Sequence, residues 1–377
     1  MSVTLNFERQ RQAQRYAIAH RVLYLADLAI GAILLGGIVV SGGASALRDL
    51  TSPAPFGRIG TIAEFVLLLL LVSTVLTFPL TVYGGWVLPR RNGLSVQTIW
   101  AWLIDWLKGL AIGLVLGLVL IEVVYALLQL IPDWWWLATA VIYLLFTVVL
   151  ASLAPILLLP LFFKLTPLDR PDLAERLEQR ARQAGTRVRG VYRINLSSKT
   201  TAANAALMGL GNTRRIVLGD TLLDHYSPAE IDVVFTHELG HHLHRDVPRL
   251  IVGQSIVTLI GLYLCGLVLS WSIGTYGYHS IADPATLPIL ALTLGAFGLL
   301  SAPLTNYLSR RWEREADLYA LQTTDDPQAF QSAMIRLANQ NLAEYDPPAW
   351  VETIFYDHPA IARRVRLAES YARGTDG

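Results

Sequence analysis

The sequence predicts an integral membrane protein built mainly of α-helices, with about six transmembrane helices and a water-exposed α+β segment. Three observations predict this class. Hydrophobic residues make up 53% of the 377 positions and charged residues only 16%, whereas soluble domains usually carry about 25% charged residues. Six apolar runs are each near or above the roughly 20 residues that cross a bilayer. Between the fourth and fifth runs lies a segment of charged helices and short strand-like stretches.

The six apolar runs alternate with connections that are rich or poor in basic residues. They cover roughly residues 22–40, 62–86, 110–131, 134–163, 251–271 and 287–308. Pro155 and Pro160 are expected to kink the fourth run or to end its membrane part, because proline removes a helical hydrogen-bond donor. Arg and Lys gather in the N-terminal tail and after the second, fourth and sixth runs. Basic connections stay on the cytoplasmic side, so both termini and the segment after the fourth run are predicted to be cytoplasmic.

This alternation divides the chain into four predicted parts. Residues 1–163 hold four transmembrane helices, 164–250 form a cytoplasmic α+β segment, 251–308 hold two more transmembrane helices, and 309–377 form a cytoplasmic helical segment. The formal net charge of +1 provides no basic field for nucleic acid, so membrane lipid is an expected partner and nucleic acid is not. The single cysteine excludes a disulfide framework and a cysteine-rich metal site. Almost all basic residues are Arg, which indicates a GC-rich bacterial genome and hence a bacterial plasma membrane.

The 164–250 segment is predicted to contain helices and a small sheet. A charged helix over 172–184 is closed by Gly185, a residue type that commonly follows a helix end. Strand-like runs cover residues 187–194, 202–208 and 215–218. Gly211 and Asn212 lie between the last two runs, and such residues predict the turn of a hairpin.

The next helix carries the motif His237-Glu238-Leu239-Gly240-His241. Ser227 and Glu230 predict its start, as the two members of a capping box. Residues four apart share a helix face, so both imidazoles can bind one ion. Glu238 then lies beside the ion, where it can take a proton from a metal-bound water. Two imidazoles and one carboxylate, with the fourth position left to water, are typical of a catalytic zinc site.

A carboxylate that completes this site is expected directly after the sixth apolar run. Glu313 is the candidate. The helix with His237 and His241 leads into the fifth apolar run, and Glu313 follows the sixth run, so both are predicted to lie on the same side of the membrane. Asp317 lies four residues later on the same helical face, where it can accept the ring N–H of a ligand histidine. The rival ligand is Glu315, which lies off that face by about 200° of helix rotation.

Near the C-terminus, His358 and Pro359 precede a basic run that includes Arg363 and Arg364. On its own this pattern is typical of a basic amphipathic tail helix. A histidine beside basic residues can also bind the oxyanion that forms when water attacks an amide carbonyl. The residues alone leave both interpretations open and favour the tail helix.

Together these motifs resemble the type I CaaX prenyl endoprotease family, a family of integral-membrane zinc metallopeptidases. The likeness begins near residue 81 and runs through segments 91–98, 160–168, 204–205, 215–218, 220–223, 309–320 and 358–364. Asp246, nine residues after His237, is similar to the related bacterial heat-shock membrane proteases. Eukaryotic members of the family have seven spans, whereas six are predicted here. The span that this chain lacks would fall between the first and second apolar runs.

The resemblance implies a fold, a cofactor and a role for each motif. The fold is a barrel of membrane helices around an intramembrane chamber, closed on one side by a cytoplasmic zincin-like domain. Glu238 is implied to be the general base, and His358 and Arg364 to face the scissile carbonyl. The strand at Asn204 and Ala205 is implied to pair with the substrate backbone as an added strand. The implied zinc ligands are His237, His241 and Glu313.

We therefore expect a zinc metalloendopeptidase that hydrolyses peptide bonds at the cytoplasmic face. Its expected partners are peptide or protein substrates that are lipidated or inserted in the membrane. Two substrate classes are open: CaaX-like tails, and misfolded membrane proteins removed by quality control. The alternatives outside proteolysis are a transporter that uses a polar cavity and a catalytically inactive scaffold. Intact zinc and base motifs argue against the transporter, and zinc content would test the scaffold.

Overall fold

Six helical stretches among the described residues are long and apolar enough to cross a membrane. The structure is a computed structural model that describes residues 4–51, 57–209 and 214–374. The six stretches are Phe7–Val40, Arg58–Arg91, Ile99–Leu130, Trp135–Leu161, Asp246–Tyr276 and Pro284–Thr324. Each of them overlaps one of the predicted apolar runs. Four contain their run completely and extend beyond it, whereas the third ends at Leu130, one residue before the predicted end, and the fourth is shorter at both ends than the predicted 134–163.

The first four stretches form the N-terminal part of the molecule. Their helices are α1 (Phe7–Val40), α2 (Gly43–Thr51), α3 (Arg58–Val82), α4 (Leu88–Arg91), α5 (Ile99–Leu130) and α6 (Trp135–Leu153). The regular helix α6 ends just before Pro155, and a π-helical turn (Ala154–Leu158) and a 3-10 turn (Leu159–Leu161) follow it. Proline lacks an N–H and clashes with the preceding turn, so the predicted disruption at Pro155 and Pro160 is confirmed.

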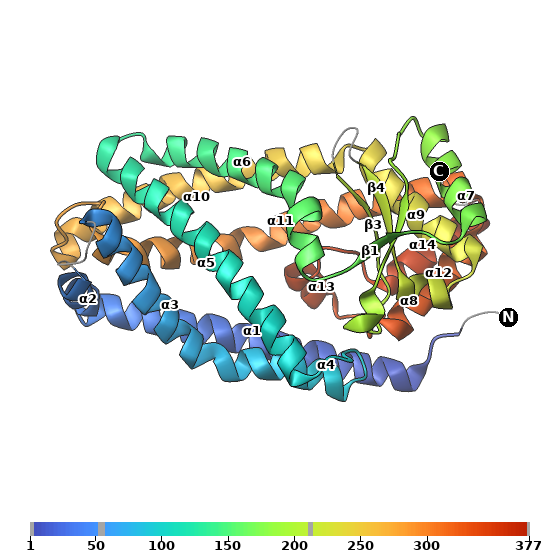
Figure 1. Ribbon diagram of the computed structural model, residues 1–377, viewed down its shortest axis with the longest axis horizontal. Helices are drawn as coiled ribbons and strands as arrows, with labels where there is room; N and C mark the ends of the chain where they lie inside the picture. The colour runs from blue at the N-terminus through green and yellow to red at the C-terminus, as the bar shows by residue number, and fades with distance from the viewer. Residues whose placement is uncertain (1–3, 52–56, 210–213, 375–377) are drawn as a thin grey trace.

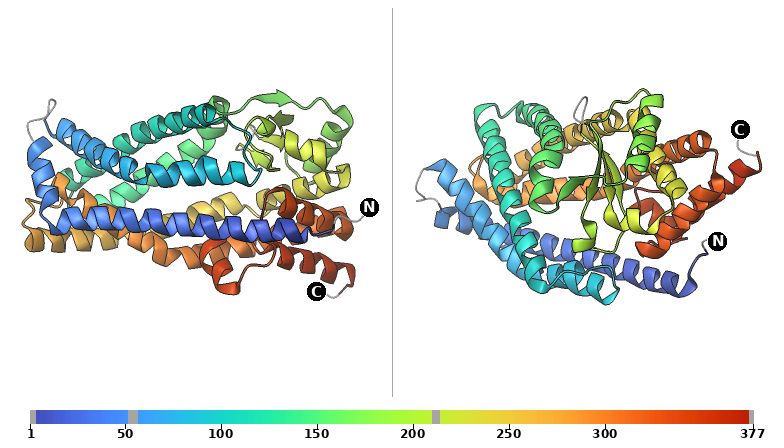
Figure 2. Two further views of the ribbon diagram at one scale, coloured as in Figure 1. Left: turned by 90° about the horizontal axis from the view of Figure 1, so that it is seen from below. Right: turned by 45° about the vertical axis from the view of Figure 1, so that its right-hand side comes forward.

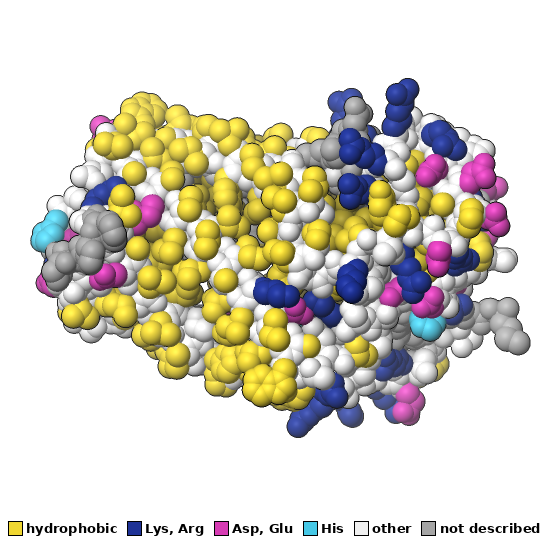
Figure 3. Space-filling model, viewed as in Figure 1, with side chains coloured by type: hydrophobic (Ala, Val, Ile, Leu, Met, Phe, Trp, Pro, Cys, Tyr) yellow, Lys and Arg dark blue, Asp and Glu magenta, His cyan; other side chains and the backbone are white. Residues whose placement is uncertain are grey.

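The long helices run along the molecule, and the small sheet lies at one end (Figure 1). The start of α1 and the end of the last helix both lie at this sheet end, as Figure 2 also shows. Hydrophobic side chains cover the other half of the visible face, while charged side chains gather over the sheet end (Figure 3). Leu71, Val115 and Val252 are each about 60% exposed (59%, 61% and 60%). Apolar surface exposed on this scale is stable when lipid rather than water surrounds it.

The sheet has four short strands in the order β1-β2-β4-β3. They are β1 (Leu165–Pro167), β2 (Val191–Ile194), β3 (Ala205–Met208) and β4 (Arg215–Gly219). β2 and β4 are parallel, and the other two pairs are antiparallel. The predicted hairpin therefore exists as β3 and β4, although Gly211 and Asn212 of its turn lie outside the described residues. β1 was not among the predicted strands, because three residues are too few to show an alternating pattern.

Helices cover the sheet and continue the chain from it. They are α7 (Pro171–Gln183), α8 (Asp220–His225), α9 (Pro228–Leu243), α10 (Asp246–Tyr276), α11 (Leu287–Thr324), α12 (Pro327–Gln340), α13 (Ala349–Phe355) and α14 (Ile361–Ala372), with 3-10 turns at Leu196–Ser198 and Pro284–Thr286. One apolar core joins α7, α9 and the sheet, and a second joins α9 to α11, α12 and α14. Since α9 belongs to both cores, it is buried from two sides and its position is firmly set.

Two membrane helices extend without interruption into the part that holds the sheet. α10 begins at Asp246, and α11 continues to Thr324. The predicted boundaries at residues 250 and 308 thus fall inside continuous helices. Between α9 and α10, Arg245 adopts a left-handed conformation (φ 57°), which allows the chain to turn sharply there. The membrane helices therefore position the motifs of α9 and α11 directly.

Candidate metal centre

The helix that carries the His pair begins at a fixed point. The Ser227 backbone N–H donates to Oε2 of Glu230 (2.7 Å), and the Glu230 N–H donates to Oγ of Ser227 (3.3 Å). This is the predicted capping box. Glu230 also accepts hydrogen bonds from Ser332 and Arg336 of α12. Although burial raises the pKa of the Glu230 carboxyl, these bonds hold it below its usual value, so the ionised cap also ties α9 to α12.

A close crossing of α9 and α11 brings the third donor to the His pair. A Cβ atom added to Gly240 would lie 3.0 Å from Cα of Ala316 and 3.3 Å from its carbonyl oxygen. The absence of a side chain at Gly240 therefore allows the two backbones to touch. One helical turn before Ala316, α11 presents Glu313 to the motif on α9.

The donor atoms of His237, His241 and Glu313 all lie within 4.8 Å of one another. The Nε2 atoms of the two histidines are 3.2 Å apart, and each lies 3.3 Å from one carboxylate oxygen of Glu313. Within the described part of the chain, Oε2 of Glu313 is buried and receives no hydrogen bond, despite the nearby ring nitrogen. Two imidazole nitrogens and a carboxylate that converge on one point satisfy one another poorly, but they fit a shared metal ion well.

The rival ligand Glu315 lies elsewhere. Its Oε2 accepts a hydrogen bond from Arg249 of α10 at 2.7 Å. The prediction that Glu313 rather than Glu315 faces the His pair follows from helix rotation, and the geometry agrees with it. Glu315, the alternative ligand, instead forms an ion pair that joins α11 to α10.

A carboxylate lies behind each histidine. Oδ1 of Asp317 is 2.9 Å from Nδ1 of His237, and Oδ2 of Asp246 is 2.9 Å from Nδ1 of His241. Such partners orient the ring and make the other nitrogen a better ligand. Of these two carboxylates, only Asp317 was predicted to orient a ligand histidine. Asp246 was noted for its spacing, but its contact depends on the turn at Arg245, which the sequence did not reveal.

Glu238 lies between the two histidines in the sequence, and its carboxyl interacts electrostatically with His237, His241 and Glu313. Burial raises the pKa of the Glu238 carboxyl, and the positive charge of His237 and His241 opposes this rise. A carboxylate whose pKa is shifted toward neutrality is a better general base than a solvent-exposed one. For His237, burial would lower the pKa, but the adjacent carboxylates of Asp317 and Glu313 raise it to about 9.

The structure brings His358 to the metal donors from the C-terminal segment. Its Nε2 lies 3.1 Å from Oε1 of Glu313, its Nδ1 lies 2.8 Å from Oδ1 of Asp357, and its side chain is 56% exposed. The hydrogen bond with Asp357 raises the pKa of His358, although burial opposes it. His358 can therefore present an N–H toward a group that enters from the open side.

Arg364, which was predicted to face the scissile carbonyl, is buried and contacts Asp317 and His237. It is 8% exposed, and its Nε donates to Oδ2 of Asp317 at 2.9 Å. Its Nη2 donates to the other oxygen of Asp317 and lies 3.3 Å from Nδ1 of His237. This ring atom lies opposite the Nε2 that faces the metal donors, so the contacts of Arg364 lie behind the ligand histidine.

The loop that carries His358 is held by two residues that the sequence analysis missed. Nη1 of Arg310 in α11 donates to the carbonyl oxygens of Glu352 (2.8 Å) and Tyr356. Oε1 of Glu352 accepts the N–H of Ala360 at 3.1 Å. Arg310 is 42 and 46 positions away from its two acceptors, so no local pattern could have indicated these bonds.

The predicted substrate-pairing strand lies at the edge of the sheet. β3 is the last strand in the order, pairs only with β4 within the described sheet, and packs against α9. Asn204 precedes it and is exposed, while Ala205 is its first residue. An edge strand beside the His helix leaves one row of backbone groups for another strand.

Two sequence-family models cover nearly the whole chain. The model described as "Peptidase family M48" matches residues 167–372, and the one described as "CAAX prenyl protease N-terminal, five membrane helices" matches residues 3–164. Four of the candidate membrane helices lie in the described part of this second range. Between α1 and α3, where the span that this chain was expected to lack would fall, α2 has nine residues, far fewer than the roughly 20 that cross a bilayer.

Individual proteins are similar over most of the chain. Metalloprotease YhfN of Bacillus subtilis (strain 168) is 28% identical over 362 residues, which are 95% of this chain and 84% of that protein. CAAX prenyl protease 1 of Saccharomyces cerevisiae is 27% identical over 344 residues, which are 85% of this chain and 76% of that protein. The crystal structure of S. mikatae Ste24p superposes with a TM-score of 0.86 at 21% identity and covers 98% of this chain and 92% of that one.

The structural likeness confirms the predicted fold class, in which membrane helices surround a chamber and a small α+β domain closes one side. The predicted resemblance to CaaX prenyl proteases is also confirmed. The M48 model alone matches more than half of the sequence. The chain therefore belongs to peptidase family M48 and is an integral membrane metalloendopeptidase that acts on peptides or proteins.

Proposed function

We propose that this peptidase binds zinc through His237, His241 and Glu313. The observation that carries the proposal is the convergence of their three donor atoms within 4.8 Å, a ligand set that suits Zn²⁺ with one position left open. A bound zinc ion would supply a Lewis acid that polarises the scissile carbonyl and lowers the pKa of water. Asp317 and Asp246 hold the two rings for this task, each through an Nδ1 atom.

The other residues of the site act on protons and on charge. Glu238 takes the proton from the attacking water and passes it to the leaving amine. His358 donates an N–H to the oxyanion, because Asp357 holds its other nitrogen and favours the protonated ring. Arg364 acts through Asp317 and His237, since these are the groups that its guanidinium contacts. The edge of the sheet at Asn204 and Ala205 binds the substrate backbone.

The proposed substrates are membrane-associated proteins, with CaaX-like tails as the first class. The similarity to a CAAX prenyl protease supports this class. The proposed location is a bacterial plasma membrane with the site and both termini on the cytoplasmic side, which the alternation of basic connections supports. Misfolded membrane proteins are the second class, which the place of Asp246 nine residues after His237 supports, since it is similar to the bacterial heat-shock membrane proteases. We propose that the division of the chain at residues 163, 250 and 308 separates parts with different functions, although residues 250 and 308 lie inside continuous helices.

Cleavage-site mass spectrometry with the wild type and Glu238→Gln tests the function. A farnesylated CaaX peptide, the same peptide without the lipid, and an unfolded membrane protein are incubated with each enzyme in detergent. The wild type is expected to cut at defined bonds, and Glu238→Gln to retain one zinc ion by elemental analysis without cutting. Cleavage by the zinc-loaded variant would refute the role of Glu238, and a wild type that contains zinc but cuts none of the three would refute the function.

A further inference from the structure

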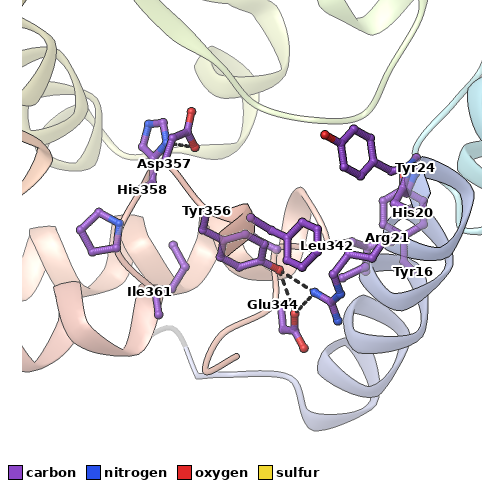
Figure 4. A pocket seen from close by; sticks show the side chains of 15 residues that line it. Tyr16, His20, Arg21, Tyr24, Leu342, Glu344, Tyr356, Asp357, His358 and Ile361 are labelled. Carbon is purple, nitrogen blue, oxygen red and sulfur yellow. Dashed lines mark hydrogen bonds and ion pairs between the residues drawn. The ribbon is translucent and has the colours of Figure 1, made fainter. Parts of the chain in front are cut away.

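A cavity of about 500 Å³ lies between the first membrane helix and the loop that carries His358. One wall is a single face of α1, and the other is formed by residues 342–344 and 355–361 (Figure 4). The α1 residues that line it are Tyr16, Ala17, His20, Arg21 and Tyr24. This volume lies within the roughly 300–1,000 Å³ that is typical of ligand pockets.

The cavity is connected to the metal centre through His358. This residue lines the cavity, and its Nε2 lies 3.1 Å from Oε1 of Glu313. In an extended peptide, successive residues are about 3.3 Å apart and their side chains point to alternate sides. In a substrate whose scissile carbonyl reaches His358, a neighbouring side chain is therefore within reach of this cavity.

The cavity is suited to an uncharged side chain. Its one arginine is already neutralised, because Nη1 of Arg21 lies 2.9 Å from Oε2 of Glu344, which also accepts the hydroxyl of Tyr356 at 2.8 Å. Figure 4 shows this triad across the cavity, between α1 and the opposite wall. Much of the remaining lining is aromatic or aliphatic, namely Tyr16, Ala17, Tyr24, Leu342, Ala343, Phe355, Pro359 and Ile361. Asp357 is paired with His358, and among the described lining residues Nε2 of His20 is the buried side-chain atom without a hydrogen-bond partner. A charged group that left water here would therefore find no free group of opposite charge.

From this geometry we propose that the cavity is the subsite for a large apolar side chain of the substrate, next to the bond that is cut. Ala17 and Ala343 lie on opposite walls, and their small side chains keep the space open. The Arg21–Glu344 ion pair joins the two walls and sets the width. The first membrane helix thus takes part in substrate selection, and the inference rests on the proposed peptide cleavage.

Variants that fill the cavity test this subsite. Ala17→Phe and Ala343→Phe each fill it from one wall, and Ile18→Phe is the matched control, since Ile18 is 53% exposed on the same helix and does not line the cavity. Peptides that the wild type cuts are varied to Ala, Leu or Phe at each position beside the cleavage site. The kcat/KM value is measured for every pair of enzyme and peptide, with zinc content and thermal unfolding as controls for folding.

The wild type and Ile18→Phe are expected to prefer Leu or Phe over Ala at one position by about 10- to 100-fold. Both filling variants should lose this preference and still cut the Ala peptide. The subsite is overturned if either folded filling variant retains the preference, or if its rate falls equally for all peptides. A loss confined to farnesylated peptides would also overturn it, since the cavity would then hold the lipid. A wild type that cuts no peptide would refute the proposed function, which is a separate outcome.

Discussion

Gly240 offers a sharp test of how the metal centre is assembled, because it has no side chain that could bind the metal or the substrate. In Gly240→Ala, the new Cβ would lie 3.0 Å from Cα of Ala316. Carbon atoms without a bond between them prefer separations of about 3.5–4.0 Å. The helices α9 and α11 must therefore move apart by a few tenths of an ångström at their crossing, and Glu313 moves with α11.

The expected effect is large on metal binding and small on stability. Overpacking costs about 1–3 kcal/mol, while alanine favours a helix over glycine by about 1 kcal/mol, so the two terms largely cancel. Ligand distances in a metal site tolerate only about 0.2 Å of change. A displacement of the third ligand beyond that tolerance should weaken zinc binding and lower kcat/KM, each by about 10-fold.

The assay compares zinc affinity, by competition with a chelator, with kcat/KM and the midpoint of thermal unfolding. Gly253→Ala in α10 is the control, since a Cβ added there meets nothing within 4 Å. It should leave zinc affinity and activity unchanged. If Gly240→Ala binds zinc and cuts peptides as well as this control, the close approach of α9 and α11 does not set the geometry of the site.

Three further predictions follow from the groups around the site. Asp246→Asn should weaken zinc binding about 10- to 100-fold, because His241 loses the partner that orients it, and zinc affinity that equals the wild type would contradict this. Arg364→Lys should reduce zinc affinity along with kcat, whereas a loss of kcat at unchanged zinc affinity would show that Arg364 binds the oxyanion instead. Glu230→Gln should lower the unfolding midpoint at pH 7, since the depressed pKa of Glu230 stabilises the fold above its unfolded value of about 4.3. That advantage should disappear as pH falls through the folded pKa, so midpoints that stay equally far apart at low pH would refute it.

The local features of the site could be predicted from the sequence. The spacing of His237 and His241 places both rings on one helix face, because the helical repeat is a property of the chain itself. The capping box at Ser227 and Glu230 is local for the same reason. The membrane spans could also be predicted, since a helix that crosses lipid needs a long run of apolar residues whichever other helices surround it.

Glu313 is an intermediate case. Its distance along the chain from His241 is large, but the order of the membrane spans brings both to the same side of the membrane. Topology therefore limited the choice to a few acidic residues, and helix rotation favoured Glu313 over Glu315. The close crossing at Gly240 and Ala316, which brings the carboxylate within reach, is visible only in the fold.

The remaining groups were decided by tertiary structure alone. The place of Asp246 behind His241 depends on a backbone turn at Arg245, and the place of Arg364 behind Asp317 depends on how α14 packs beside α11. The cavity beside His358 has one wall from α1 and one from residues more than 300 positions later. The periodicity of a sequence indicates which face of a helix or strand is buried. It does not indicate which other element packs against that face, and these contacts depend on that packing.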